Sequence, residues 1–119
     1  MNLIHVLVVD DDPAVSAYVC AVLRRAGYEV SAASDLEHAA NLAAGRPLDV
    51  LLSDVVLGRV DGLDVDEAVR RVRPAVKTLF MSAYARPRYG SGADDPVLVK
   101  PFEPDELLER IRLLVESAS

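Results

Sequence analysis

The chain has 119 residues, of which 51% are hydrophobic, and this suits one domain with a core of its own. Its net charge of −6 argues against direct nucleic acid binding, which needs clustered Lys and Arg, and its single cysteine excludes an internal disulfide and a zinc motif. No run of about 18 apolar residues occurs, so we expect no membrane insertion, and the cysteine usage indicates a reducing, cytoplasmic setting.

The first strand and helix are predicted from an apolar run and the residues that follow it. Residues 3–9 are apolar and rich in β-branched side chains, which is typical of a strand covered on both faces. Asp12 followed by Pro13 favours a helix N-cap and first turn. Gly27 is typical of a helix C-terminus, so we expect the helix to end there.

The second strand and helix follow directly. Residues 28–33 predict the strand. Ser34, with Glu37 three residues later, matches a capping box, so we expect Ser34 to cap the second helix. Gly45 and Pro47 are expected to end that helix.

The second half of the chain continues the alternation. An apolar run at residues 49–54 predicts a third strand. A loop is expected at residues 57–64, and we interpret its Asp61-Gly62 pair as turn chemistry. The remaining predicted elements are helices at 63–73 and 103–117 and strands at 76–82 and 97–100.

Five strands that alternate with helices predict an α/β domain with a doubly wound, five-stranded parallel sheet and helices on both faces. In such sheets, ligands bind beyond the carboxyl ends of the strands. Asp10 and Asp11 follow the first predicted strand, and Asp54 ends the third. Ser82 and Lys100 end the fourth and fifth, so these five side chains are expected to converge.

The expected cluster combines three carboxylates, a hydroxyl group and an ammonium group. Carboxylates this close repel one another, and a hard divalent cation such as Mg²⁺, which prefers oxygen ligands, removes that penalty. Asp54 is then a candidate nucleophile, because a carboxylate that attacks phosphorus forms an aspartyl phosphate. Lys100 and Ser82 can donate hydrogen bonds to phosphate oxygens. The cluster therefore favours phosphoryl transfer with Mg²⁺ as cofactor.

Four motifs, in this order, resemble those of the receiver domain of two-component response regulators, and the resemblance covers essentially the whole chain. They are VVDDD (8–12), LLSDVVLGRVDG (51–62), LFMSAY (79–84) and VKPF (99–102). The resemblance is greatest to receivers attached to hybrid histidine kinases and to single-domain receivers. It implies a flavodoxin-like strand order of 2-1-3-4-5, a histidine kinase or histidine phosphotransfer protein as phosphoryl donor, and a downstream protein partner.

The resemblance also implies a role for each residue of the cluster. Asp54 is the expected phosphoacceptor, and Asp12 is expected to cap a helix outside the metal pair. The expected metal ligands are Asp10, Asp11, Asp54 and the backbone carbonyl of Val56, the expected phosphoryl contacts are Ser82 and Lys100, and the expected cis-proline is Pro101.

Three departures from the family pattern change these expectations. Val97 stands where most family members have an aromatic switch residue, and we consider Tyr84 as its substitute. Residues 85–95 form a short segment interrupted by Gly and Pro, so we predict weak order there. Gly58 replaces the usual proline after the phosphoacceptor, and Val56 brings no polar side chain to orient water, which favours slow self-dephosphorylation.

Two other functions are weighed beside the signalling receiver. The VVDDD motif also fits a haloacid-dehalogenase-type phosphatase, with Asp10 as nucleophile and Asp12 as acid–base. Such enzymes need a further acidic pair after the lysine and usually a longer chain, and here Asp94 and Asp95 precede Lys100. A phosphorylation-independent pseudo-receiver that only binds partners is the other alternative. The intact set of Asp10, Asp11, Asp54, Ser82 and Lys100 argues against this alternative. We expect the chain to assist its own phosphorylation and dephosphorylation and not to be a turnover enzyme.

The domain organisation is expected to be simple. Residues 1–119 are interpreted as a single receiver domain without an output domain. The apolar stripe at 107–115 is most simply core, and its outer flank is a candidate face for a partner or a homodimer. His5 has no partner at metal-ligand spacing and is interpreted as structural or surface.

Overall fold

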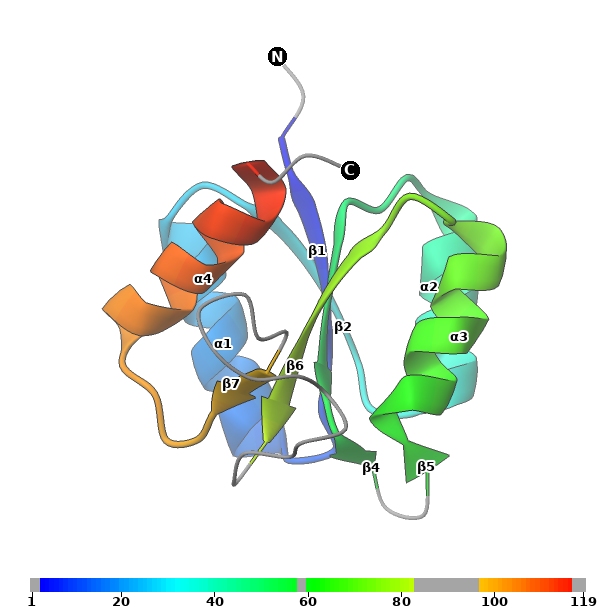
Figure 1. The fold of residues 1–119 in the computed structure, drawn as a ribbon, viewed down its shortest axis with the longest axis horizontal. Coiled ribbons are helices and arrows are strands. Elements are labelled where there is room, and N and C mark those ends of the chain that lie inside the picture. Colours follow the sequence, from blue (N-terminus) through cyan, green and yellow to red (C-terminus); the bar gives the residue numbers. More distant parts are fainter. Residues whose placement is uncertain (1–2, 58–59, 83–96, 117–119) are drawn as a thin grey trace.

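The chain folds into one five-stranded parallel sheet with helices packed against both of its faces (Figure 1). This computed structural model describes residues 3–57, 60–82 and 97–116. The strands are rich in β-branched and other apolar residues because a parallel sheet is covered on both sides. The strands are β1 His5–Val9, β2 Glu29–Ala33, β3 Val50–Asp54, β6 Lys77–Ser82 and β7 Val97–Val99.

The strand order is β2-β1-β3-β6-β7, and every neighbouring pair is parallel. Counted along the chain among these five strands, this is the order 2-1-3-4-5, so the predicted fold class is confirmed. Because the strands run in one direction, their carboxyl ends meet at one edge of the sheet.

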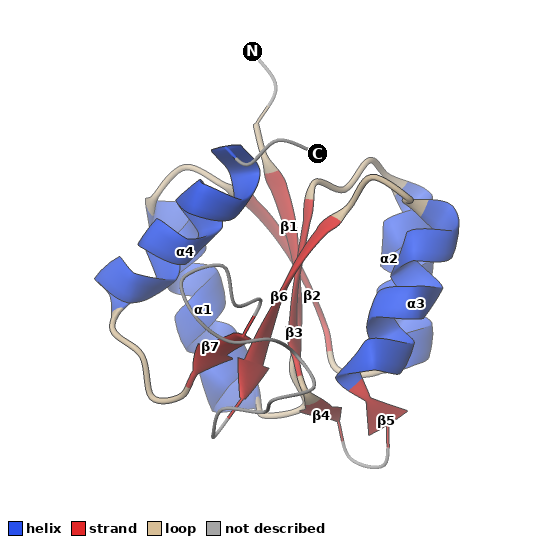
Figure 2. Cartoon of the chain, in the orientation of Figure 1, coloured by secondary structure: helices blue, strands red, loops and turns tan. Residues whose placement is uncertain are grey.

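A second, two-stranded antiparallel sheet lies just after β3, where the sequence predicted only a loop. It pairs β4 (Val56–Leu57) with β5 (Val60–Asp61). Strands of two residues are too short to show hydrophobic alternation, which is why the prediction was wrong here. Figure 2 shows the arrowheads of β6 and β7 at the same end of the molecule as β4 and β5.

The helices divide between the two faces of the sheet. Figure 1 shows α1 and α4 on one side and α2 and α3 on the other. The longest described helices have 13 residues, and no helix in the described ranges is long and apolar enough to cross a membrane. The helices are α1 Pro13–Arg25, α2 Leu36–Gly45, α3 Gly62–Val72 and α4 Pro104–Glu116.

The core has one layer on each face of the sheet, and β1 contributes to both. Val6 and Val8 pack in a cluster with residues of α1 and α4, whereas Leu7 and Val9 pack in a cluster with residues of α2 and α3. All four side chains are at most 1% exposed. Successive residues of a strand point to opposite faces, so burial on both faces accounts for the unbroken apolar run.

The helix ends test the capping predictions. Asp12 caps α1 as predicted, and its carboxylate accepts a hydrogen bond from the Ala14 amide. The prediction for α2 was wrong, because the N-cap is Asp35 and not Ser34. The Asp35 carboxylate accepts from the His38 amide at 2.8 Å. The helix therefore starts one residue later than predicted, which removes Glu37 from the third helical position that a capping box requires.

Candidate functional site

The predicted site residues lie at the carboxyl edge of the sheet. Asp10 directly follows β1, Asp54 is the last residue of β3, and Ser82 is the last residue of β6. Lys100 directly follows β7. Since β1, β3, β6 and β7 are adjacent and parallel, the fold brings together residues that the sequence separates widely.

Three carboxylates form the acidic part of the site. Asp10, Asp11 and Asp54 each offer one oxygen, and these oxygens lie within 4.8 Å of one another. Asp10 is buried at 2% exposure, Asp54 is partly buried and Asp11 is exposed. Carboxylate oxygens gathered at this distance, with one residue facing solvent, fit a hard divalent cation such as Mg²⁺, which prefers oxygen ligands and keeps several waters.

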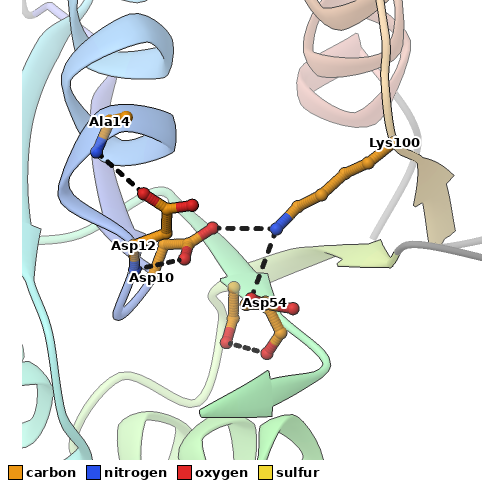
Figure 3. Close-up of polar contacts among 6 residues, drawn as sticks. Asp10, Asp12, Ala14, Asp54 and Lys100 are labelled. Atoms are coloured by element: carbon orange, nitrogen blue, oxygen red, sulfur yellow. Dashed lines mark hydrogen bonds and ion pairs between the residues drawn. The ribbon is translucent and has the colours of Figure 1, made fainter.

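Lys100 reaches across the edge of the sheet to two of these carboxylates (Figure 3). Its Nζ lies 3.1 Å from Oδ2 of Asp10 and 3.3 Å from Oδ2 of Asp54. Burial of the ammonium group lowers the pKa of Lys100, but the hydrogen bond and charge of Asp10, followed by those of Asp54, outweigh this and raise it above its usual value of 10.5. Lys100 therefore remains a fixed positive charge at neutral pH.

Asp10 makes hydrogen bonds to the backbone of other residues as well as to Lys100. Its amide donates to the Ala33 carbonyl at 3.2 Å, and its Oδ1 accepts from the Asp12 amide at 2.9 Å. The Asp12 carboxylate turns instead to the Ala14 amide at the start of α1 (Figure 3). The three consecutive aspartates thus divide between the acidic site and the helix cap.

Backbone hydrogen bonds join the strand ends that carry the site. The Lys100 amide donates to the Ser82 carbonyl at 2.6 Å, and Ser82 is buried at 4% exposure. The Val55 amide, next to Asp54, donates to the Met81 carbonyl at 2.9 Å. The separations between the site residues are therefore set by the sheet rather than by loops.

The remaining predicted site residues fall into two groups. The Lys100–Pro101 peptide bond is cis, as expected. Val56 lies in β4, in register with Asp61. Tyr84, Gly58 and residues 85–95 lie outside the described residues, so the predictions that depend on them stay predictions.

Val97 is the residue at which the sequence departs from the aromatic side chain of the family pattern. It is 3% exposed and packs in a small cluster with Val55 and Phe80. Its side chain is part of the core next to the end of β3. Because residue 97 is valine, the aromatic switch of the family pattern has no counterpart at this position.

Sequence reasoning missed one residue that contacts this site. Gly62, which we interpreted as part of a turn, is the first residue of α3, and its amide donates to the Val55 carbonyl at 2.6 Å. No signal in the sequence separates this contact from an ordinary turn, because Asp61-Gly62 fits both.

Comparison with known proteins identifies the receiver domain that the sequence motifs resemble. A family profile described as the response regulator receiver domain matches residues 6–112. The chain resembles the chemotaxis protein CheY4 of Vibrio cholerae with a TM-score of 0.85 and 29% identity, over 95% of this chain and 99% of that one. It resembles the receiver domain of the hybrid histidine kinase CckA with a TM-score of 0.79 and 29% identity, over 94% and 99%.

Curated relatives are longer proteins. The chain is 38% identical over 118 residues to the DNA-binding dual master transcriptional regulator RpaA of Synechocystis sp., covering 93% of this chain and 48% of that protein. It is 34% identical over 116 residues to the transcriptional regulatory protein TcrA of Mycobacterium tuberculosis, covering 93% and 46%. The chain thus spans about half the length of these relatives.

Proposed function

The chain belongs to the response regulator receiver domain family, and on that premise we propose that it accepts a phosphoryl group on Asp54 and passes the resulting change of state to a protein partner. The observation that carries the proposal is the joint placement of Asp54, two further aspartates and Lys100 at one edge of the sheet. That edge combines a partly exposed carboxylate nucleophile with a cation beside it.

The proposed reaction uses the carboxylate of Asp54 as nucleophile. A phosphohistidine on a histidine kinase or phosphotransfer protein is the proposed donor. One oxygen of Asp54 attacks its phosphorus, the O–P bond forms as the N–P bond breaks, and the imidazole leaves with the bonding electron pair. Lys100, 3.3 Å from the Asp54 carboxylate, is placed to donate to a phosphoryl oxygen, and we assign the same task to the Ser82 hydroxyl.

A divalent cation is part of the proposal. Asp10, Asp11, Asp54 and the backbone carbonyl of Val56 are the proposed ligands, and the oxygen cluster of the three aspartates fits this assignment. Bound Mg²⁺ supplies positive charge for the phosphoryl oxygens. The buried carboxylate of Asp10, held by the Asp12 amide and Lys100, keeps its position before any metal binds.

Phosphorylation would change the charge balance that Lys100 now holds. A phosphoryl group adds nearly two negative charges, so Lys100 and Ser82 are expected to be drawn toward Asp54 and away from Asp10. We propose that a downstream protein prefers this second arrangement. We propose that residues 1–119 form one receiver domain. It assists its own phosphorylation but is not a turnover enzyme in this proposal, and we still predict that it loses the phosphoryl group slowly.

The phosphatase alternative is not favoured by the geometry of Asp10 and Asp12. The Asp10 side chain has no exposed surface, and its two oxygens contact the Asp12 amide and Lys100. Asp12, the proposed acid–base of that alternative, caps α1. The pseudo-receiver alternative predicts that Asp54→Asn leaves partner binding unchanged, whereas the proposed switch predicts that it abolishes the phosphorylation-dependent part.

Intact-mass spectrometry after incubation with acetyl phosphate and Mg²⁺ tests the proposal. We expect one added phosphoryl group on the unaltered chain, none on Asp54→Asn, and none when Mg²⁺ is chelated. Asp12→Asn is the matched control, because asparagine also caps helices and Asp12 lies outside the carboxylate cluster, so it should still be labelled. Labelling that persists in Asp54→Asn but is lost in Asp10→Asn would support the phosphatase instead.

A further inference from the structure

We infer that Gly62 is a positioning residue for the phosphoacceptor site, because its lack of a side chain lets α3 begin directly against the backbone of Asp54 and Val55. The inference rests on the proposed function, and it adds a residue to which that function gives no role. It is carried by the space around Gly62 and by two backbone connections of the same segment.

The space beside Gly62 is filled by backbone atoms. A Cβ at this position would lie 2.5 Å from the Asp54 carbonyl oxygen, 3.0 Å from the Val55 Cα and 3.1 Å from the Val55 carbonyl oxygen. None of these atoms belongs to a side chain that can rotate away. Any larger residue therefore has to displace the end of β3, the start of α3, or both.

Two backbone contacts join residues 55–56, just after β3, to residues 61–62 at the start of α3. The Gly62 amide donates to the Val55 carbonyl at 2.6 Å, and Asp61, the residue before it, pairs in register with Val56. Asp61 also caps α3 by accepting from the Leu63 amide at 2.8 Å. The start of α3 is thereby tied to Val56, whose carbonyl is a proposed metal ligand, and it touches the carbonyl of Asp54.

The consequence concerns the backbone that presents two proposed ligands. The Asp54 carboxylate and the Val56 carbonyl both depend on the segment that Gly62 contacts, whereas Asp10 and Asp11 are set by β1 and α1. A shift of the first pair relative to the second changes the ligand geometry without removing a ligand. Partners that orient metal ligands typically contribute 10–100-fold in affinity.

Gly45 provides a matched control for a glycine-to-alanine change. It is the last residue of α2, and a Cβ there would have nothing within 4 Å. Gly62→Ala and Gly45→Ala therefore add the same methyl group at a helix end, against backbone in one case and into open space in the other.

The test is a titration of the folded chain with Mn²⁺ alone, an oxygen-seeking ion that reports its free concentration by electron paramagnetic resonance. We expect Gly62→Ala to raise the Kd for Mn²⁺ by at least about tenfold. Gly45→Ala should leave it unchanged. Labelling of Asp54 by acetyl phosphate at saturating Mn²⁺ gives a second readout, and it should also be slower in Gly62→Ala alone.

A destabilised control separates positioning from stability. Ile111→Val removes a methylene from the fully buried core under α4, and it should lower stability while leaving the Kd for Mn²⁺ unchanged. If Gly62→Ala is unfolded in buffer, the titrations of all variants are repeated in trimethylamine N-oxide, which favours the folded state.

The outcomes are distinct. A Kd for Gly62→Ala within tenfold of the unaltered chain, or an equal loss in Ile111→Val, would overturn the positioning role. Failure of the unaltered chain to bind Mn²⁺ would instead refute the proposed function, and this inference with it.

Discussion

Asp10 and Lys100 form an ion pair across 90 positions of sequence, with Nζ 3.1 Å from a carboxylate that has no exposed surface. The pair joins the residue that follows β1 to the residue that follows β7. Lys100 also lies 3.3 Å from Asp54, so one ammonium group offsets part of the repulsion between two carboxylates. This arrangement makes the titration of Lys100 a direct report on the site.

We predict that the pKa of Lys100 lies above 10.5 and falls when either partner loses its charge. Asp10→Asn should lower the pKa of Lys100 more than Asp54→Asn, because the hydrogen bond and charge of Asp10 raise it more. A raised pKa in the folded state means that the pair contributes stability below pH 10.5, and that this contribution is lost as pH rises through the folded-state pKa. Carbon-13 shifts of the lysine ε-methylene, followed between pH 9 and 12 on the folded chain, measure the effect. An unshifted Lys100 in Asp10→Asn would contradict it.

A second prediction concerns stability without metal. Lys100→Met should lower the free energy of unfolding by about 2–3 kcal/mol, because it leaves the buried Asp10 carboxylate without its cation. This is less than for a fully buried pair, since the Lys100 side chain is 22% exposed. Added Mg²⁺ should restore part of the loss, because an ion that binds only the folded state stabilises it. Urea unfolding with and without Mg²⁺ measures both effects.

Arg71→Met is the control for that measurement. Arg71 pairs with Glu67 on the exposed face of α3, where both side chains are more than half exposed. Its loss should change the free energy of unfolding by no more than about 0.5 kcal/mol, with no response to Mg²⁺. Equal losses in the two variants would mean that the Lys100 pair behaves as an ordinary surface ion pair.

The sequence predicted the sheet and the convergence of the site because both follow from local patterns combined with one topological rule. Apolar runs located the strands, and parallel strands brought Asp10, Asp54 and Lys100 to one edge. The approach of Gly62 to the Asp54 carbonyl was not predictable in this way, because it depends on how α3 packs against β3. Strands β4 and β5 were missed because two residues each carry no periodicity.

The cap of α2 gives a third prediction, in which the sequence pattern and the structure disagree. Asp35→Ala should lower the free energy of unfolding by about 1 kcal/mol, because the His38 amide loses its acceptor. Ser34→Ala should change it by only a few tenths of a kcal/mol, as expected for an exposed residue outside the cap. Thermal or urea unfolding of the two variants decides between them. A larger loss in Ser34→Ala would restore the capping box that the sequence suggested.

The last prediction concerns His5, which joins three segments at the opposite end of β1 from the site. His5 is 3% exposed, its Nδ1 lies 2.8 Å from the Pro47 carbonyl oxygen, and its Nε2 lies 2.8 Å from the Ser31 hydroxyl. A carbonyl only accepts, so Nδ1 carries the proton, and in the neutral ring Nε2 accepts from Ser31. Nitrogen-15 shifts of the neutral ring should therefore show the Nδ1–H tautomer.

Ser31→Ala extends that prediction to stability. It removes the partner of Nε2 in a buried ring, so the free energy of unfolding should fall by about 1–3 kcal/mol. Asp54 labelling in the folded variant should be unchanged, because Ser31 lies in β2, an outer strand of the sheet, whereas the site residues follow or end β1, β3, β6 and β7. A neutral ring that carries its proton on Nε2 would contradict the tautomer, and an unchanged stability in Ser31→Ala would show that the hydrogen bond to Ser31 does not anchor β1 to β2.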